Sequence, residues 1–266
     1  MFTDNPNLKQ IADGIWIYKN FVSKEKVEEI NKIMDQYKNN PDLPNTAGGT
    51  KYDEMLLNWY QDKTSPNILE LYPIWKKINE LFYPEYAIHP QLFLIVTREN
   101  DEMFIHSDSP GEGMEESLSA EDRWNTCCVL HYGAVVYFGD FTGGEVFYPH
   151  FDNQGNFIGN RIPYEEGREL RVQPEPGDLV IHGALKNHAH GVHNITSGFR
   201  YAYSNFVLPV SKNPGTFPLY NTKENDERWE KGPTEWLTPI GFKWEPSETL
   251  KKELLTEDAG KINYKN

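Results

Sequence analysis

The chain is poor in cysteine. Its 266 residues include 2 cysteines, and these are neighbours, Cys127 and Cys128. A bridge between adjacent cysteines strains the backbone, and no third cysteine is present as a partner. The sequence therefore excludes a disulfide framework and favours a reducing compartment. We interpret the pair as strand residues on opposite faces, one of them in the core.

Basic side chains and long hydrophobic runs are also scarce. The chain carries 26 Lys and Arg against 40 Asp and Glu, a formal net charge of −14. Such a surface repels polyphosphates, which argues against a nucleic-acid substrate. Residues 1–20 contain charged side chains and no apolar run, so we expect neither a signal peptide nor a membrane span. The expected location is cytoplasmic.

Large aromatic side chains are plentiful, at 14 % of the chain. Rings of this size can fill the core of one sizeable domain, so the sequence predicts a single domain over residues 1–266. Within it we expect N-terminal helical support over residues 11–90, a β-rich core over residues 91–210, and a C-terminal extension over residues 211–266. The fold class is mostly β with flanking helices (α+β).

Hydrophobic periodicity predicts two helices among many strands. One helix begins after Ser23 as N-cap and runs to about residue 37, with Val27, Ile30 and Met34 inward; the second spans residues 67–83. Residues 39–51 are expected to be loop, and a short helix is expected near residues 247–255. The predicted strands cover residues 11–21, 91–97, 103–108, 126–138, 144–148, 170–173, 179–182, 190–195 and 200–208.

A His-x-Asp pair is the sharpest chemical signal. His106 and Asp108 lie two positions apart on a predicted strand, so both side chains can reach one ion while Ser107 turns away. His190 follows 82 positions (190 − 108) after Asp108, and Arg200 follows ten positions (200 − 190) later. Two histidines and one carboxylate are the components of a facial triad that leaves half of an octahedral iron open. Bringing them together requires a late strand to return beside an early one.

The histidines leave alternatives open. A lone His-x-Asp is more often a surface accident than a metal site, and the chain has 8 histidines. His182, His188, His190 and His193 crowd one segment, which also fits a metal-binding tract without catalysis or polar strand ends. The offset to Arg200 favours His190 as third ligand, with His188 as the second candidate.

Several motifs together resemble one known family. In chain order they are Asn20-Phe21-Val22-Ser23, His106-Ser107-Asp108-Ser109-Pro110, the run from Val135 to Glu145, Pro174-Glu175-Pro176-Gly177-Asp178-Leu179, and His190-Gly191-Val192 with Arg200-Tyr201. The stretch from about residue 11 to 208 resembles the prolyl-4-hydroxylase-type iron(II)/2-oxoglutarate oxygenases. The resemblance implies a double-stranded β-helix (jelly-roll) catalytic core with N-terminal helices.

The resemblance also implies roles for six residues. His106, Asp108 and His190 are implied to be the iron(II) ligands. Arg200 is implied to bind the 5-carboxylate of 2-oxoglutarate, and the hydroxyls of Tyr137 and Ser204 are implied to assist it. Many relatives carry a tyrosine that binds the cosubstrate just before the His-x-Asp, where this chain has Thr97 and Arg98. The contacts on that side are left open. The implied cofactors are Fe(II), the cosubstrate 2-oxoglutarate, O2 and ascorbate as reductant.

The implied reaction converts 2-oxoglutarate to succinate and carbon dioxide while a C–H bond of the substrate is hydroxylated. Prolyl 4-hydroxylation of a peptide or protein is our first expectation. Alternatives are a hydroxylase of a free amino acid or another small molecule, a nucleic-acid demethylase, which the acidity disfavours, and a non-catalytic β-barrel binding protein. Residues 39–60 and 109–125 are predicted to be long loops of the kind that cover active sites.

Overall fold

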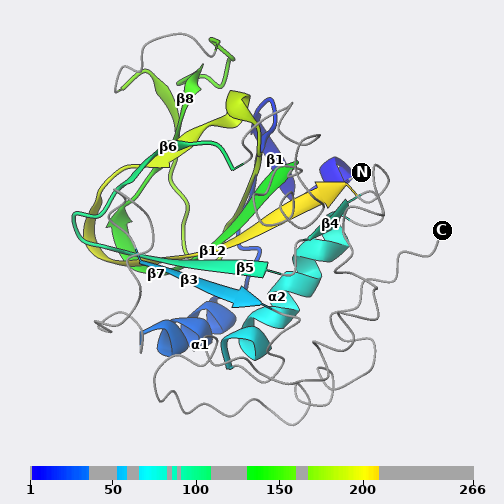
Figure 1. Ribbon diagram of the computed structural model, residues 1–266, viewed down its shortest axis with the longest axis vertical. Helices are drawn as coiled ribbons and strands as arrows, with labels where there is room; N and C mark the ends of the chain where they lie inside the picture. Colours follow the sequence, from blue (N-terminus) through cyan, green and yellow to red (C-terminus); the bar gives the residue numbers. More distant parts are fainter. Residues whose placement is uncertain are drawn as a thin grey trace, which may run out of the picture.

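Two antiparallel sheets face each other in the described part of the computed structural model (Figure 1). The structure describes residues 2–35, 53–58, 66–82, 86–88, 91–108, 131–159 and 167–209. Our predictions for Cys127 and Cys128, for the loops over residues 39–51 and 109–125, and for residues 211–266 lie outside the described residues.

The larger sheet contains eight of the described strands, and the smaller sheet contains four. The larger has the order β1 (Leu8–Ala12), β2 (Ile15–Tyr18), β10 (Leu179–Gly183), β7 (Tyr132–Gly143), β12 (Ile195–Pro209), β5 (Gln91–Arg98) and β3 (Asp53–Asn58), with β4 (Tyr86–Ile88) also paired to β12. The smaller has the order β6 (Met103–His106), β11 (His190–Val192), β8 (Val146–Asp152) and β9 (Glu169–Val172).

The strands from β5 to β12 pass back and forth between the two sheets. Strands β5, β7, β10 and β12 lie in the larger sheet, and β6, β8, β9 and β11 lie in the smaller one. Such alternation gives the two-sheet topology of a jelly roll. The expected mostly-β fold is therefore confirmed. It brings chain segments far apart in sequence to the same space between the sheets.

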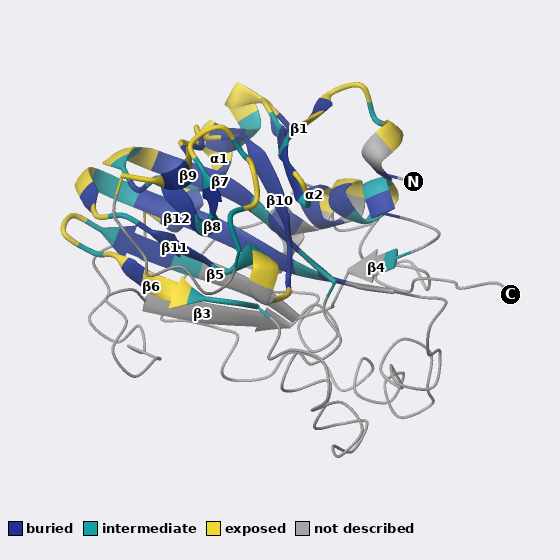
Figure 2. Ribbon diagram, turned by 90° about the horizontal axis from the view of Figure 1, so that it is seen from above, coloured by how far each residue is buried: buried dark blue, intermediate teal, exposed yellow. Residues whose placement is uncertain are grey.

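Buried side chains from both sheets fill that space. A core cluster combines Ile15, Ile17, Tyr137, Val180 and Ala202 of the larger sheet with Val146, Tyr148, Phe151, Leu170 and Val172 of the smaller one. In Figure 2 buried residues follow β7, β10 and β12, whereas exposed residues gather on the connecting loops. Alternating inward and outward side chains allow each strand to face the core on one side and helices or solvent on the other.

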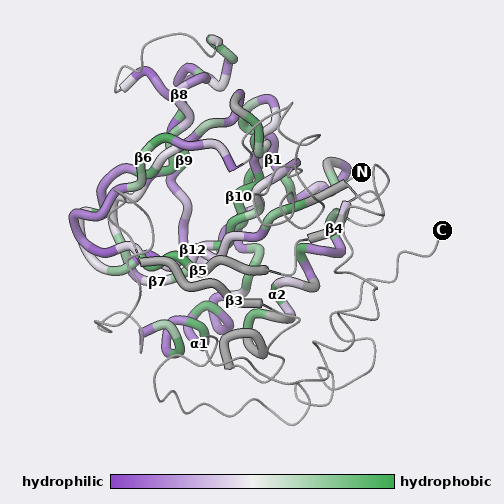
Figure 3. The backbone as a smooth tube through the Cα atoms, viewed as in Figure 1, coloured by the Kyte–Doolittle hydropathy of each residue, from purple (hydrophilic) through white to green (hydrophobic). Residues whose placement is uncertain are grey.

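Two helices lie against the outer face of the larger sheet (Figure 1). Helix α1 (Lys24–Met34) begins where predicted, with the Ser23 hydroxyl accepting the Lys26 N–H at 3.3 Å. Its buried face includes Ile33 besides the three predicted residues, and hydrophobic and hydrophilic residues alternate along it in Figure 3. Helix α2 (Pro66–Phe82) matches the second prediction within one residue at each end. No helix in the described part of the chain is long and apolar enough to cross a membrane.

Several boundary predictions were wrong. The strand predicted over residues 190–195 ends at Val192 in β11, and Ile195 already opens β12 in the other sheet. The single strand predicted over residues 11–21 is a hairpin of β1 and β2, because Gly14 takes a φ of 70° and turns the chain. Residues 53–58, placed in a predicted loop over 39–60, form the edge strand β3 beside β5. The strand predicted over residues 103–108 ends at His106, so Asp108 lies beyond it. Since residues 11–90 contribute four strands as well as two helices, their role as helical support stays a prediction.

One buried carboxylate fastens the corner between β2 and α1 to the turn before β10. Asp178 is 1 % exposed and accepts hydrogen bonds from the Lys19 ammonium at 2.7 Å, the Asn20 N–H at 3.0 Å and the Glu175 N–H at 2.8 Å. The same turn pairs with Tyr137 through N–H and carbonyl bonds in both directions. Asp178 therefore holds together three segments distant in sequence.

We predict that Asp178→Ala lowers the free energy of unfolding by about 2–4 kcal/mol, because two backbone N–H groups and the Lys19 ammonium together lose one buried, charged acceptor. Glu175→Ala is the matched control. Glu175 also pairs with Lys19, at 3.3 Å, but its side chain is 72 % exposed, so the expected loss is below about 0.5 kcal/mol. Urea unfolding of the two variants checks this, and equal losses would contradict the assigned role of Asp178.

Candidate metal centre

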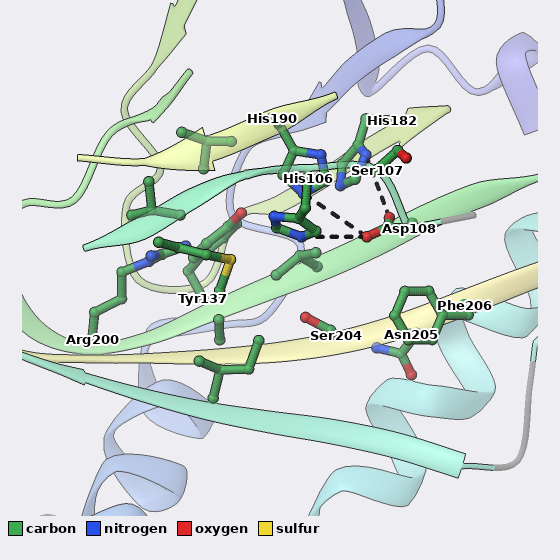
Figure 4. Close-up of a pocket in the computed structure, with 17 residues that line it drawn as sticks. His106, Ser107, Asp108, Tyr137, His182, His190, Arg200, Ser204, Asn205 and Phe206 are labelled. Atoms are coloured by element: carbon green, nitrogen blue, oxygen red, sulfur yellow. Dashed lines mark ion pairs between the residues drawn. The ribbon is translucent and has the colours of Figure 1, made fainter. Parts of the chain in front are cut away.

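Three potential metal ligands converge from two segments that are far apart in the sequence. His106 is the last residue of β6, Asp108 follows two residues later, and His190 opens β11. Strands β6 and β11 pair antiparallel with His190 opposite His106. One ligand atom from each residue lies within 4.8 Å of the others, and Figure 4 shows the three side chains facing one another. The residues expected at the centre are thus brought together.

Both imidazoles present the same nitrogen to the carboxylate. Nε2 of His106 lies 3.7 Å from Asp108 Oδ1, and Nε2 of His190 lies 4.0 Å from the same oxygen. Each Nδ1 instead faces a backbone carbonyl, that of Phe104 at 3.0 Å and that of His188 at 3.1 Å. Since a carbonyl accepts only, the neutral form of each ring carries its proton on Nδ1 and keeps a lone pair on Nε2.

Burial keeps His190 neutral. Desolvation, with the neighbouring His182 and His106, holds the pKa of His190 well below its ordinary value. A neutral imidazole is the form that binds a metal ion. The group of two Nε2 atoms and one carboxylate oxygen can therefore hold a divalent cation.

The three residues open onto a cavity between the sheets. It has a volume of ≈ 210 Å³, and its walls include apolar side chains such as Ile95, Met103, Val135 and Val146. Arg200 of β12 lines the same cavity together with Tyr137 of β7. The cavity therefore combines a metal-binding group with one buried cation.

Arg200 is 3 % exposed and its Nε has no hydrogen-bond partner among the described residues. Its guanidinium carbon lies 4.9 Å from the centre of the Tyr137 ring, and it forms no ion pair with a carboxylate in the described part of the chain. Burial lowers the pKa of Arg200, an effect that Tyr137 opposes, yet a guanidinium stays charged in proteins. A buried cation without a counter-ion is costly, so this end of the cavity suits an anionic ligand.

The two expected supporting hydroxyls lie in different places. Tyr137 is buried beside Arg200, where burial raises the pKa of its phenol against the opposing effect of Arg200. Ser204 also lines the cavity, but it is four residues beyond Arg200 on β12. At ~3.3 Å per strand residue the two Cα atoms are about 13 Å apart. Ser204 therefore lies away from the Arg200 end (Figure 4).

The sequence left open whether Thr97 or Arg98 contributes to the site. The two residues are consecutive on β5, so their side chains face opposite sides of the sheet. Thr97 stands opposite Arg200 in the β5–β12 register, and its buried hydroxyl has no partner among the described residues. The Tyr148 hydroxyl of β8 is buried and unpartnered in the same sense. Thr97 is thus the one of the two that lies beside Arg200.

His188, the second candidate for the third ligand, is engaged elsewhere. Its Nε2 lies 3.1 Å from the Asp13 carbonyl, and its ring stacks near Phe151. A Cβ on Gly14 or Gly183 would overlap that ring, so both glycines make room for it. His188 joins the β1–β2 hairpin to the segment before β11 and stays outside the group of three ligands.

His182 is a site residue that sequence reasoning did not assign. It lies on β10, is 2 % exposed, and packs its ring 4.1 Å from that of His190. Its Nδ1 is 3.8 Å from Asp108 Oδ2, and burial lowers its pKa. The available signal was one polar residue within the wholly buried run of β10, Leu179–Gly183.

Comparison with known proteins gives a fold and no closer relationship. No family model and no curated protein sequence matches the chain. Among solved structures, a prolyl-4-hydroxylase from Pseudomonas putida superposes with a TM-score of 0.52 at 12% identity, over 79% of this chain and 99% of that one. A prolyl hydroxylase from Trichoplax adhaerens, in complex with a peptide fragment of the hypoxia inducible factor oxygen degradation domain, gives 0.51 at 12% identity, over 79% and 88%. These likenesses show a shared fold.

We predict that His190→Ala weakens Mn²⁺ binding by at least about 100-fold, because a direct ligand is lost. Loss of a residue that only hydrogen-bonds a ligand usually weakens binding by about 10- to 100-fold. His188→Ala is the matched control and is expected to bind Mn²⁺ like the wild type, because its ring lies outside the group. Calorimetric titration of both folded variants checks this. A larger loss in His188→Ala would reverse the assignment.

Proposed function

We propose that this protein is an iron(II)/2-oxoglutarate-dependent dioxygenase that hydroxylates a C–H bond. One observation carries the proposal: the His106–Asp108–His190 group lines the same cavity as Arg200, a buried cation that forms no ion pair with a carboxylate among the described residues. A metal ion alone would need no buried cation nearby. An anionic ligand alone would need no group of three ligand atoms.

The donor set fits iron(II). Two imidazoles and one carboxylate match the ligand types of non-haem iron(II) oxygenases and leave coordination positions open. His106, Asp108 and His190 would hold the ion. When bound, iron(II) supplies the activation of O2 that couples conversion of 2-oxoglutarate to succinate and CO2 with hydroxylation of the substrate.

The residues of the chain would bind and orient the cosubstrate. Arg200 would hold the 5-carboxylate through a charge-assisted pair, with the Tyr137 hydroxyl beside it. Apolar walls at Ile95, Val135 and Val146 would exclude water around the chain of the diacid. We assign Ser204 to this cavity as well, toward the end away from Arg200.

For the substrate, we propose proline in a peptide or protein, with 4-hydroxylation as the reaction and ascorbate as reductant. The fold is shared with prolyl hydroxylases, one of them in complex with a peptide. A free amino acid or another small molecule is the alternative. We further propose a cytoplasmic location. We also propose a single domain over residues 1–266, with N-terminal helical support over residues 11–90, the catalytic core over residues 91–210 and a C-terminal extension over residues 211–266.

We predict that the purified protein forms succinate from 2-oxoglutarate with Fe(II) and ascorbate, and faster with proline-rich peptides. His106→Ala is the control and should form none, because one ligand is missing. Mass spectrometry of the peptide should show one added oxygen. Stimulation by free amino acids and not by peptides would contradict the proposed peptide substrate and leave the proposed dioxygenase activity standing.

We predict that Arg200→Ala raises the 2-oxoglutarate concentration needed for half-maximal rate by more than about tenfold, the equivalent of one charged hydrogen bond. Iron affinity should stay near that of the wild type, since Arg200 contributes no ligand. Arg98→Ala is a matched control on the neighbouring strand. A normal cosubstrate requirement in Arg200→Ala would remove Arg200 from the site.

A non-catalytic binding protein makes the opposite prediction for Asp108→Ala. If the protein is an enzyme, Asp108→Ala should lose turnover, and its melting temperature should equal that of the wild type. Ligand binding that needs no metal and survives both Asp108→Ala and His190→Ala, in a protein without succinate formation, would favour the binding protein.

A further inference from the structure

We propose that His182 is a positioning residue of the metal centre, which holds the second oxygen of Asp108 so that the first faces the metal. The inference rests on the proposed function for the nature of the site, and it concerns metal binding rather than turnover. His182 is outside the group of three ligands, and its contact with Asp108 is set by the larger sheet.

The two oxygens of Asp108 face different partners. Oδ1 is the oxygen nearest to Nε2 of His106 and of His190, at 3.7 and 4.0 Å. Oδ2 points to His182, whose Nδ1 lies 3.8 Å away. In Figure 4 the dashed line from His182 ends on one oxygen of the Asp108 carboxylate, and the lines from His106 and His190 end on the other. The carboxylate is thus divided between a metal-facing oxygen and an oxygen that faces a third imidazole.

Within the described part of the chain, Asp108 has few other contacts that fix its orientation. It lies two residues past the end of β6, where the sheet no longer sets the backbone. Among the described residues it accepts no hydrogen bond, and its close charged or polar contacts are these three imidazoles. Without His182 the carboxylate can rotate, and a rotated carboxylate offers the metal a different oxygen or both.

His182 itself is held firmly. Its Nδ1 lies 3.2 Å from the Gly183 carbonyl, which fixes the proton on Nδ1, and its ring meets that of His190 edge to face. The N–H edge that approaches Oδ2 is therefore the positive edge of the ring. At 3.8 Å the contact is electrostatic attraction and longer than a hydrogen bond.

Gly133 makes room for this contact. It stands opposite His182 in the β7–β10 register. A Cβ there would lie 2.6 Å from Asp108 Oδ2 and 2.9 Å from His182 Nε2. Only glycine leaves the carboxylate and the imidazole space to meet over the strand. Strands β7 and β10 of the larger sheet thus help to set the position of Asp108, which follows β6 of the smaller sheet.

The test compares two substitutions at one position. His182→Phe keeps the ring shape and removes the N–H, whereas His182→Asn places an amide N–H near the former Nδ1. In His182→Phe we expect the Mn²⁺ affinity to fall about 10- to 100-fold, the usual effect of losing a partner of a metal ligand. In His182→Asn we expect it to fall by less than about threefold, because the amide N–H replaces the lost donor. His193→Phe is the control for a histidine-to-phenylalanine change, since His193 stacks on Phe147 outside the centre. It should bind like the wild type.

A merely structural role predicts a different pattern. If His182 only fills the core, His182→Phe should bind Mn²⁺ with the affinity of the wild type. His182→Asn should then lower the melting temperature of the metal-free protein, and its Mn²⁺ affinity should be no higher than that of His182→Phe. Gly133→Ala gives a second, independent variant. It retains His182, but its Cβ would push the Asp108 carboxylate and the His182 ring out of their contact, so it should weaken Mn²⁺ binding as His182→Phe does.

Two results would overturn the proposal. One is wild-type Mn²⁺ affinity in folded His182→Phe. The other is the loss of one coordinated imidazole in His182→Phe, counted by pulsed electron paramagnetic resonance of the Cu²⁺-loaded protein, because His182 would then be a ligand. Failure of the proposed function looks different: the wild type would bind Mn²⁺ and depend on His182 but form no succinate from 2-oxoglutarate.

Discussion

The pairing of β6 with β11 is the constraint on which the candidate site depends. It sets His190 opposite His106 across the smaller sheet, although the two lie 84 positions apart in sequence (190 − 106). Side chains alternate between the faces of a strand, so a slip of one residue would turn His190 out of the cavity. The jelly roll enforces the pairing, because the chain passes repeatedly between the two sheets and returns β11 beside β6. In the larger sheet, the β7–β12 register sets Arg200 diagonally across from Tyr137 in the same way.

Charge balance links the two ends of the cavity. Asp108 contributes one negative charge, Arg200 one positive charge, and the buried His182 and His190 are held neutral. A divalent cation at the His-Asp-His group and a dianion reaching Arg200 add no net charge to this interior. Either one alone would leave the buried space charged, which a low-dielectric environment penalises. The site is therefore suited to binding the two together. The overall charge of −14 belongs to the whole chain and does not alter this balance inside the cavity.

Much of the fold and of the site could be predicted because the signals are local. Ser23 caps its helix through its own side chain, and the i, i+2 spacing of His106 and Asp108 is visible in three residues. The structure adds what depends on distant neighbours. His182 has its partner only because β10 lies beside β7 and leaves Gly133 under Asp108. The edge strand β3 has no strong pattern of its own and exists by pairing with β5. The distance between Arg200 and Ser204 follows from the extended strand between them, which a list of motif positions does not convey.

The most direct measurement is the affinity of 2-oxoglutarate for the protein with and without Mn²⁺, a divalent ion that stands in for Fe(II) and binds the same ligand types. Glutarate, which keeps both carboxylates and lacks the 2-oxo group, is the matched ligand. If metal and cosubstrate share the cavity, Mn²⁺ should strengthen 2-oxoglutarate binding by more than about tenfold, equivalent to ~1.4 kcal/mol of coupling, and strengthen glutarate binding far less. Equal 2-oxoglutarate affinity in the presence and absence of Mn²⁺ would contradict a site in which the His-Asp-His group and Arg200 hold the two ligands together.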